Sequence, residues 1–452
     1  MLFRSVGIVE KENDVAMGAT KANSAIVHAG FDAKEGSLKA KLNVRGSEMM
    51  EEVCQKLGVK YKRNGSLVIG FTDEDKKMLE SLLTRGECNG VKGLRLISGD
   101  EARALEPALS EEVTAALHAP TGAIVCPYEL AVSAIGNAMD NGAELNLNFE
   151  VTKIEETEDG FTLWSGDKSI STRYLINSAG IYSDDVAKLL GTEGYKITPR
   201  RGEYMLLDKE CGSTVSHTIF RTPTKMGKGI LVTPTVDGNL LVGPTSVDID
   251  DKENKATTDE GFAKIMREAR ENVPAIKLGK VITSFTGLRS TGNTGDFVIE
   301  KKGRAINLVG IESPGLTASV AIGEYVLEML SDTDLLNTKK EGFIETREPM
   351  HFFREASIEE KNEMIKKDKS YGKIVCRCEG VSEGEILAAI RTNPRPTDLD
   401  GVKRRTRSQM GRCQGGFCSP TIAELISREL GIPMERITKF GGSSNIVVGK
   451  TK

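Results

Sequence analysis

The sequence predicts a mixed α/β and α+β body followed by a small cysteine-bearing unit, and three observations support this fold class. Up to about residue 335, short β-rich runs alternate with helical patterns, as they do in α/β and α+β chains. Residues 336–372 are then mostly polar and charged, which is typical of a linker. Beyond them, four of the eight cysteines lie between residues 376 and 418. A chain of 452 residues has room for about three domains.

The individual elements follow from the spacing of apolar residues. Short apolar runs bounded by turn residues predict strands, and apolar residues repeating every three or four positions predict helices. Strands are expected over residues 5–10, 66–71, 173–180, 203–208, 239–244 and 305–312. Helices are expected over residues 38–58, 74–87, 129–142 and 317–330.

Charge and hydropathy exclude several classes of protein. The chain has 61 Lys and Arg against 65 Asp and Glu, a formal net charge of −4, which argues against a nucleic-acid binder and a polybasic membrane-surface protein. No apolar run approaches the roughly 20 residues that span a bilayer. The first residues also lack the apolar core and cleavage site of a signal peptide. We therefore expect a cytoplasmic protein, in which clustered cysteines indicate metal or redox chemistry before disulfides.

Glu10 is the first candidate binding residue in the body. It ends the first predicted strand, where an acidic residue binds the ribose of a dinucleotide. Such a site is normally preceded by a glycine fingerprint, G-x-G-x-x-G, and that pattern does not occur in the chain. By spacing alone, Glu10 is as well explained as a solvated strand end.

Three further segments favour a bound nucleotide. Residues 18–31 are small and polar, so that backbone amides could approach a pyrophosphate. Residues 173–191 run from a strand through a small-residue turn into a helix, and residues 306–330 do the same. The N-terminal end of the second helix would face negative charge on a ligand. Each segment alone also has a structural explanation.

The four clustered cysteines form a C-x-C pair and a C-x4-C pair with 34 residues between them. Two close thiolate pairs suit a 2Fe–2S cluster or a tetrahedral zinc ion. Basic residues surround the second pair, and they fit a role in offsetting the negative charge of a thiolate site better than nucleic-acid binding. These residues are Lys403, Arg404, Arg405, Arg407 and Arg412.

The body resembles the FAD-dependent oxidoreductases of the D-amino-acid-oxidase and glycerol-3-phosphate-dehydrogenase superfamily. It is most similar to the branch with glycerol-3-phosphate dehydrogenase and L-2-hydroxyglutarate oxidase. The segments that carry the resemblance are 9–31, 176–187, 198–204, 231–245, 287–300 and 310–319. The resemblance implies an α/β, Rossmann-like FAD-binding domain built from about 1–45, 140–195 and 280–335. It also implies an α+β substrate domain with an antiparallel sheet, built from about 46–139 and 196–279.

The same resemblance implies roles for individual residues. Arg289, in the segment GLRST, would bind the anionic end of the substrate, since a guanidinium pairs bidentately with carboxylate or phosphate. His28 would be the base or an orienting group for the substrate hydroxyl, although a packed histidine explains it equally well. The residues expected around FAD are Glu10 at the ribose, Thr20, Asn23 and Ser24 at the pyrophosphate and flavin, Ala179 and Gly180 at the adenosine, and Gly315, Leu316 and Thr317 at the flavin.

The resemblance departs from the family pattern at its start. Family members begin with a strand, the glycine fingerprint and a helix, whereas this sequence begins at the following, acid-ending strand. The expected FAD-binding domain therefore lacks its first strand, and we expect an N-terminally incomplete member of the family.

Residues 373–386 and 401–418 resemble the bacterioferritin-associated-ferredoxin-like 2Fe–2S domain, which also occurs at the C-terminus of anaerobic glycerol-3-phosphate dehydrogenase large subunits. This implies a small helical domain over 373–430, preceded by the linker 336–372 and followed by a tail over 431–452. It also implies that Cys376, Cys378, Cys413 and Cys418 hold the cluster.

Together the two resemblances imply a flavoprotein dehydrogenase that oxidises sn-glycerol 3-phosphate to dihydroxyacetone phosphate and passes electrons through the cluster. The expected acceptor is a second flavoprotein or another redox subunit, which could lie at the membrane surface. Three alternatives stay open: a dehydrogenase for a 2-hydroxy acid such as L-2-hydroxyglutarate, an iron–sulfur carrier with an inactive flavin domain, and a zinc-holding scaffold.

Overall fold

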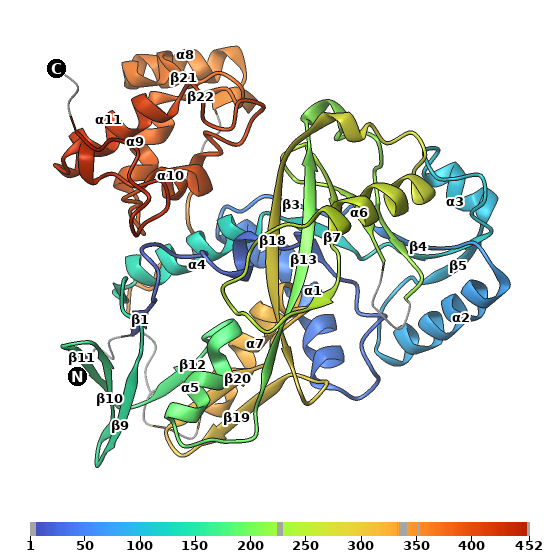
Figure 1. Cartoon of the computed structure of the whole chain (residues 1–452), viewed down its shortest axis with the longest axis horizontal. Helices are drawn as coiled ribbons and strands as arrows, with labels where there is room; N and C mark the ends of the chain where they lie inside the picture. Colours follow the sequence, from blue (N-terminus) through green and yellow to red (C-terminus); the bar gives the residue numbers. More distant parts are fainter. Residues whose placement is uncertain (1–5, 224–228, 332, 334–340, 350–352, 450–452) are drawn as a thin grey trace.

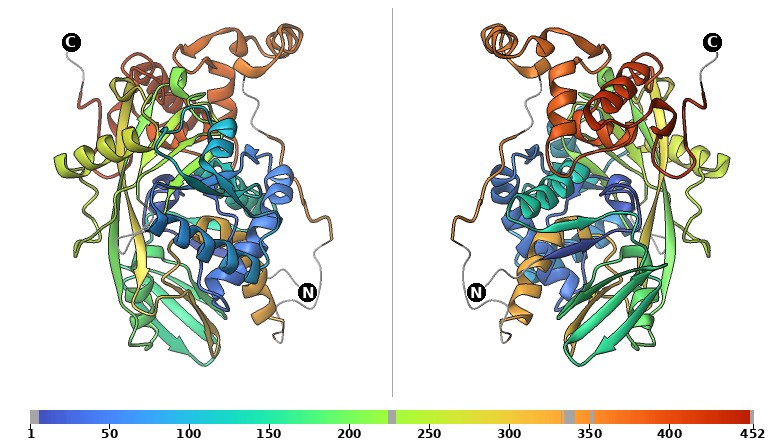
Figure 2. Two further views of the ribbon diagram at one scale, coloured as in Figure 1. Left: turned by 90° about the vertical axis from the view of Figure 1, so that its right-hand side faces the viewer. Right: turned by 90° about the vertical axis from the view of Figure 1, so that its left-hand side faces the viewer.

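The computed structural model describes residues 6–223, 229–331, 333, 341–349 and 353–449. Figure 1 shows a large twisted sheet, a smaller lobe of short strands beside it, and a compact C-terminal unit near α4 (Pro127–Asp140). Figure 2 shows the C-terminal unit at one end of the molecule, and the smaller lobe at the other. None of the helices in the described part of the chain is long and apolar enough to cross a membrane.

The large sheet has nine strands, in the order β17–β13–β16–β15–β14–β4–β6–β5, with β18 paired to β13. Neighbouring strands are antiparallel except for β14 and β4, which run parallel. The strands are β4 (Ser66–Gly70), β5 (Arg95–Ser98), β6 (Ala115–Ala119), β13 (Ile197–Leu207), β14 (Thr218–Arg221), β15 (Leu231–Pro234), β16 (Leu240–Gly243), β17 (Val247–Asp248) and β18 (Val281–Gly292).

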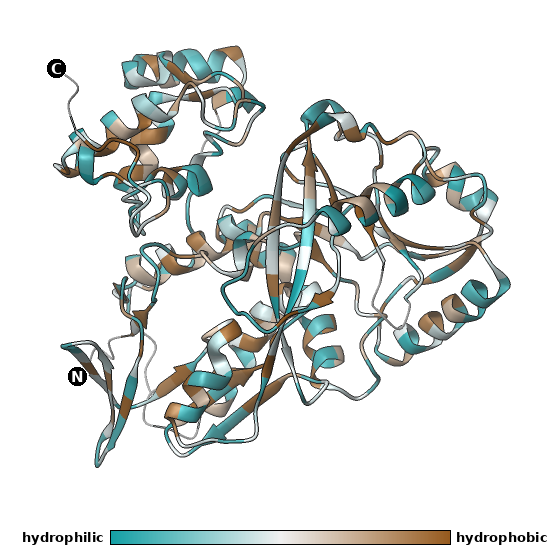
Figure 3. Cartoon of the chain, viewed as in Figure 1, coloured by the Kyte–Doolittle hydropathy of each residue, from teal (hydrophilic) through white to brown (hydrophobic). Residues whose placement is uncertain are grey.

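Both faces of the middle strands β4, β6, β14, β15 and β16 are buried, which explains why these strands are mostly apolar (Figure 3). Along β4, Leu67 and Ile69 belong to one core and Val68 to the other, as the alternation of a strand requires. Helices α3 (Gly99–Leu105) and α6 (Asp259–Asn272) cover the first face. Helix α2 (Asp73–Cys88) covers the second.

The smaller lobe contains the strands of the predicted nucleotide-binding domain in two pieces. β1 (Gly7–Val9) pairs in parallel with β8 (Glu144–Asn146), and β12 (Leu175–Asn177) pairs in parallel with β20 (Ala305–Val309). Within the described ranges no strand joins β1 to β12. The other strands here are β19 (Val298–Lys302), beside β20, and the meander β9 (Lys153–Thr157), β10 (Gly160–Ser165) and β11 (Lys168–Thr172).

Two helices connect this lobe to the large sheet. α1 (Leu38–Lys56) packs closely against α7 (Gly315–Met329), and Gly46 lies at their contact. A Cβ atom on Gly46 would lie 2.1 Å from the carbonyl oxygen of Thr317, so only glycine allows this approach. A three-stranded sheet of β2 (Ile26–Val27), β7 (Ala123–Val125) and β3 (Tyr61–Lys62) lies beside α1, and α5 (Ser183–Leu189) follows β12.

The C-terminal unit has its own core. It consists of the hairpin β21 (Ile374–Cys376) and β22 (Val381–Ser382) and of helices α9 (Glu383–Arg391), α10 (Leu399–Thr406) and α11 (Ser419–Leu430). Ile386, Ile390, Leu399, Ile422 and Ile426 form the centre of that core.

The segment predicted to be a linker holds a helix, α8 (Ile358–Lys367). A capping box explains why this charged stretch is helical: Ser357 accepts a hydrogen bond from the Glu360 backbone, and the Glu360 side chain accepts one from the Ser357 backbone. Downstream, Tyr371 packs against Gly384 of α9, which places this part of the segment in the C-terminal unit.

The other expected elements lie where periodicity predicts them, with ends shifted by a few residues. The helix expected over 38–58 is α1, and that expected over 317–330 is α7. The strand expected over 5–10 is the three-residue β1, and its first residue, Ser5, lies outside the described residues.

Replacing Gly46 with alanine is expected to destabilise the protein by about 1–3 kcal/mol, because the added methyl group forces α1 and α7 apart. Gly323→Ala on α7 is the matched control, since nothing lies within 4 Å of the position that its added methyl group would take. We expect this change to be neutral or to stabilise by about 1 kcal/mol. Urea unfolding followed by circular dichroism measures both, and equal midpoints for Gly46→Ala and the parent would contradict the packing described.

Candidate functional site

One large cavity, of about 1900 Å³, collects most of the residues predicted to bind FAD or substrate. It is larger than the roughly 300–1,000 Å³ typical of a single ligand pocket, so it has room for a dinucleotide and a substrate together. The predicted residues that line it are Glu10, Thr20, Asn23, Ser24, His28, Ala179, Gly180, Arg289, Gly315 and Leu316.

At one end of the cavity, Glu10 and Ala179-Gly180 come from the ends of two different strands. Glu10 follows β1, and its carboxylate accepts a hydrogen bond of 3.0 Å from the backbone of Glu12. Burial raises the pKa of the Glu10 carboxyl. The turn after β12 is fixed by Asn177, whose side chain accepts from the backbone of Ala179 and donates to the carbonyl of Ser183.

Residues 18–25 form the adjoining wall, and Asn23 determines its shape. The Asn23 amide donates to the carbonyl oxygens of Ala19 and Thr20, at 3.1 and 2.9 Å, and accepts from the backbone of Ala25 at 2.8 Å. Asn23 therefore holds the loop from within. The Ser24 hydroxyl is 3.1 Å from the hydroxyl of Tyr204, which reaches the cavity from β13.

The cavity is also lined by a cation suited to an anionic ligand, Arg289 of β18. The Arg289 guanidinium donates to the carbonyl oxygen of Thr245 at 2.8 Å and to those of Arg200 and Arg201 at 3.4 Å. Burial lowers the pKa of Arg289. No carboxylate among the described residues forms an ion pair with this guanidinium, so a bound carboxylate or phosphate would supply the counter-charge.

His28 also faces the cavity, with its ring stacked on Phe220 at a centroid distance of 5.7 Å. Its backbone donates to the Thr317 hydroxyl at 2.9 Å. Thr317 is fully buried and donates in turn to the carbonyl of Ile26 at 3.4 Å. The Thr317 side chain therefore joins α7 to β2 and positions His28, and it does not line the cavity.

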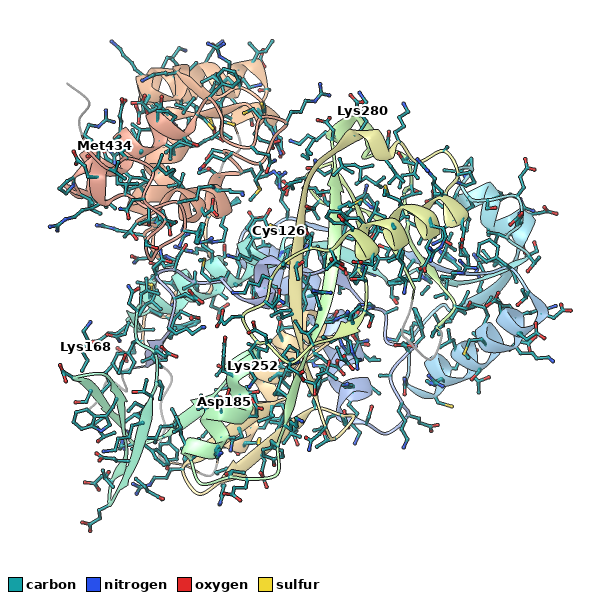
Figure 4. All side chains as sticks on the ribbon, in the orientation of Figure 1. Cys126, Lys168, Asp185, Lys252, Lys280 and Met434 are labelled. Atoms are coloured by element: carbon teal, nitrogen blue, oxygen red, sulfur yellow. The ribbon has the colours of Figure 1, made fainter. Side chains whose placement is uncertain are left out.

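Several cavity residues were not predicted from sequence. Tyr204 ends the segment TPRRGEY, which carries part of the resemblance, and its ring stacks on Phe285 at 4.8 Å. Lys21 lies in the loop of small residues over 18–31, and its long basic side chain could have indicated an anion-binding site there. Lys252 bridges Asp184 and Asp185 of α5 at 2.6 and 2.7 Å, and Figure 4 shows Asp185 and Lys252 close together.

The four predicted cluster cysteines lie together as two pairs. The sulfur atoms of Cys378 and Cys413 are 3.7 Å apart, and the thiols of Cys376 and Cys418 lie close enough to shift each other's pKa. Cys376 and Cys418 are buried, whereas Cys378 is exposed. In the part of the chain that the structure describes, no three His, Cys, Asp or Glu side chains converge as a ready-made metal site.

The surroundings of these thiols fit an iron–sulfur cluster. Burial alone would raise the pKa of the Cys413 thiol, but hydrogen bonds from the backbone of Phe417, Gly415 and Gly416 lower it. Backbone donors of this kind stabilise thiolate sulfur, which is the ligand form. Two thiol pairs of this kind could hold a 2Fe–2S cluster or a single tetrahedral ion.

Comparison with protein families supports both assignments. Residues 3–329 match the model of the FAD dependent oxidoreductase family, and residues 374–428 match that of the BFD-like 2Fe–2S binding domain. The solved structure of L-alpha-glycerophosphate oxidase from Mycoplasma pneumoniae, in a dithionite-reduced form with FAD bound, is similar to this chain with a TM-score of 0.71 and 29% identity. That match covers 76% of this chain and 92% of the oxidase.

Curated relatives are similar over different lengths. Glycerol 3-phosphate dehydrogenase of Caloramator mitchellensis is 45% identical over 451 residues, which are 99% of this chain and 94% of the relative. Glycerol 3-phosphate oxidase of Mycoplasma pneumoniae is 30% identical over 72% of this chain and 88% of its own length. Mouse mitochondrial L-2-hydroxyglutarate dehydrogenase is 29% identical over 72% of this chain and 82% of its own length.

These matches confirm the predicted fold class and the predicted cofactors, FAD and a 2Fe–2S cluster. The zinc scaffold is thereby the less well supported interpretation of the cysteine pattern. The chain belongs to the FAD-dependent oxidoreductase family and carries, over residues 374–428, a BFD-like 2Fe–2S binding domain.

Proposed function

We propose that the protein is a dehydrogenase that oxidises sn-glycerol 3-phosphate to dihydroxyacetone phosphate. The observation that carries this proposal is the 45% identity to a glycerol 3-phosphate dehydrogenase over nearly the whole chain, including both the flavin unit and the cluster unit. Oxidation of the secondary alcohol releases two electrons and two protons. FAD, when bound, would supply the acceptor for the two electrons and one of the protons, as a hydride from carbon, while the hydroxyl proton would go to a protein base or to water.

The substrate end of the cavity offers the groups that this reaction needs. Arg289 would bind the phosphate, since its guanidinium faces the cavity with only carbonyl partners among the described residues. His28 would accept or orient the substrate hydroxyl proton. The Ser24–Tyr204 pair would hold the other polar groups of the substrate or flavin.

The remaining cavity residues would hold the cofactor. Glu10 would bind the ribose, Thr20, Asn23 and Ser24 would shape the wall at the pyrophosphate, Ala179 and Gly180 would adjoin the adenosine, and Gly315 and Leu316 the flavin. We propose the same division of the body as from sequence, with FAD held mainly by 1–45, 140–195 and 280–335 and substrate mainly by 46–139 and 196–279. His28 and Arg289 would reach the substrate from the FAD-binding segments.

The cluster would carry electrons out of the protein. We infer that Cys376, Cys378, Cys413 and Cys418 ligate it, with Cys378 and Cys413 nearest the solvent. A flavin can release electrons one at a time, as a 2Fe–2S centre requires. The final acceptor would be a separate flavoprotein or other redox subunit that meets the protein in the cytoplasm, where thiols stay reduced, or at the membrane surface.

Arg289 also supports a second candidate substrate. A guanidinium binds carboxylate as readily as phosphate, and the L-2-hydroxyglutarate dehydrogenases are relatives of about 30% identity. A 2-hydroxy acid is therefore the alternative that the test of the proposal must exclude.

Anaerobic mixing of the FAD-loaded protein with each substrate distinguishes the two functions. We expect glycerol 3-phosphate to bleach the flavin absorbance and L-2-hydroxyglutarate to leave it unchanged. Arg289→Met should lower kcat/KM about 100-fold, because one charged hydrogen-bonding partner of the phosphate is lost. Arg45→Met, which removes an exposed pair with Glu324, is the control and should change it less than twofold. Bleaching by L-2-hydroxyglutarate alone would reject the proposal.

Lys21 should make FAD binding depend on pH. Burial and the nearby Arg404 and Lys255 lower the pKa of the Lys21 ammonium to about 8, against the opposing effect of Asp400 and Glu12. Lys21 is therefore charged below about pH 8 and loses its charge above it. Since FAD carries an anionic pyrophosphate, we expect its affinity to fall as the pH rises through 8.

Titration of the FAD-free protein with FAD, followed by quenching of flavin fluorescence, measures this effect. We expect the affinity for FAD to be about tenfold weaker at pH 9 than at pH 7. In Lys21→Met, the affinity should not change over this pH range. Lys41→Met, an exposed substitution on α1, should keep the parent profile. An unchanged profile in Lys21→Met would show that another group titrates.

A further inference from the structure

The loop after β1 has two sides with different surroundings. Residues 10–12 and 16–20 line the large cavity, whereas residues 13–15 do not. The middle of the loop points away from the cavity, and Asp14 and Val15 are almost completely buried, at 1% and 2% exposure. One side of the loop therefore forms the wall proposed to hold FAD. Its other side, which we call the inner side, consists of residues 13–15 and packs against another part of the molecule.

The inner side is fixed by the C-terminal unit. Arg405 of α10 donates to both carboxylate oxygens of Asp14, at 2.8 Å each, and Arg404 donates to Oδ2 at 2.5 Å. Each arginine is 5% exposed. Arg405 is itself held in place, because it also donates to the carbonyl oxygens of Pro394 and Gly401, both at 2.9 Å.

A second set of contacts holds the neighbouring residue. The Asn13 side chain donates to the carboxylate of Asp398, the residue that caps α10. Gly441 packs against the same side chain so closely that a Cβ atom would lie 2.3 Å from its amide oxygen. Residues 13 and 14 are therefore enclosed by α10 and by the segment that follows α11, and the loop has little freedom to move independently of the C-terminal unit.

The charged groups in this contact depend on one another. A buried carboxylate is costly without partners, and two buried guanidinium groups are equally costly without a carboxylate. Burial raises the pKa of Asp14, but the bonds from Arg405 and Arg404 outweigh it, so the pKa is lowered and the carboxylate stays charged. Neither side of the contact can be lost without leaving a buried charge unpaired.

We propose that Asp14, Arg404 and Arg405 are positioning residues for FAD, and that the iron–sulfur unit thereby holds one wall of the flavin site. The three residues act through the loop, since none of them lines the cavity. Binding of FAD and ordering of α10 are then coupled, and the coupling is reciprocal. This inference rests on FAD occupying the cavity and is independent of which substrate is oxidised.

The alternative is that Asp14 only attaches one unit to the other. Asp208 serves as the control for this alternative, because it also joins the body to the C-terminal unit, through an arginine that is exposed. It is also a buried aspartate of the body, 8% exposed, and accepts bonds of 2.5 and 3.1 Å from Arg412 of the C-terminal unit. Asp208 does not line the cavity and lies outside the loop of residues 10–20. Loss of the Asp208 contact should therefore loosen the attachment without moving the flavin wall.

The test compares Asp14→Asn with Asp208→Asn in the full chain, with the iron content of each measured first. Titration of the FAD-free proteins with FAD should give a Kd at least tenfold higher for Asp14→Asn, and within twofold of the parent for Asp208→Asn. The Kd of Arg405→Lys, which keeps the charge, should lie between those of the parent and of Asp14→Asn. Parent-like FAD affinity in Asp14→Asn, or an equal loss in both aspartate variants, would overturn the inference.

Hydrogen–deuterium exchange on the parent protein tests the coupling without any substitution that could impair folding. Saturating FAD should slow exchange at least threefold in residues 399–406, as well as in residues 10–20. Exchange in 399–406 that does not change with FAD would overturn the inference. Slowed exchange together with no bleaching by glycerol 3-phosphate would uphold it and reject only the proposed substrate.

Discussion

Two buried arginines of α10 meet one buried carboxylate in the loop after β1, and the placement of the two redox units relative to each other depends on this contact. Its partners are 390 residues or more apart in the sequence. Because all three side chains are almost fully buried, salt screens this interaction much less than it screens a surface ion pair. It joins the loop that lines the cavity to the helix that precedes Cys413. Together with the Asn13–Asp398 and Asp208–Arg412 contacts, it fixes how the C-terminal unit lies against the cavity.

Buried contacts between segments far apart in the sequence also shape the cavity. Its walls come from the ends of β1 and β12, from the middle of β18 and from the start of α7. Gly46 allows α1 and α7 to approach closely, and Thr317, at that crossing, fixes the backbone of His28. A residue outside the cavity therefore positions one that could act on the substrate. Arg289 extends from the large sheet and supplies a cation to the cavity wall.

Much of the fold could be predicted from sequence, and most of the residues predicted to bind FAD or substrate line the cavity. Helices such as α1 and strands such as β4 were predictable because their apolar spacing depends on local geometry. Glu10 was predictable as a cavity residue because it lies at the end of a strand, whereas Arg289, inside β18, was predictable only through the segment that carries the family resemblance. The pairing of Cys376 with Cys418 was not, since spacing alone does not tell which thiols approach each other.

The features that sequence could not show depend on tertiary packing. Thr317 was expected at the flavin, but the crossing of α1 and α7 turns its hydroxyl toward the backbone of Ile26 and His28. Asp14 carried no motif, and its partners follow only from the way α10 lies against the body. Residues 358–367 were expected in a linker because of their charge, whereas a capping box makes them helical.

The central claim is that electrons from the substrate pass from flavin to cluster within one chain. Rapid anaerobic mixing of the loaded protein with glycerol 3-phosphate, followed at the flavin and cluster absorbance bands, tests it most directly. We predict that the flavin bleaches first and the cluster second, at a rate that does not change with protein concentration. Cys413→Ser should show the first phase alone. A cluster that stays oxidised, or is reduced at a rate proportional to protein concentration, would contradict this claim.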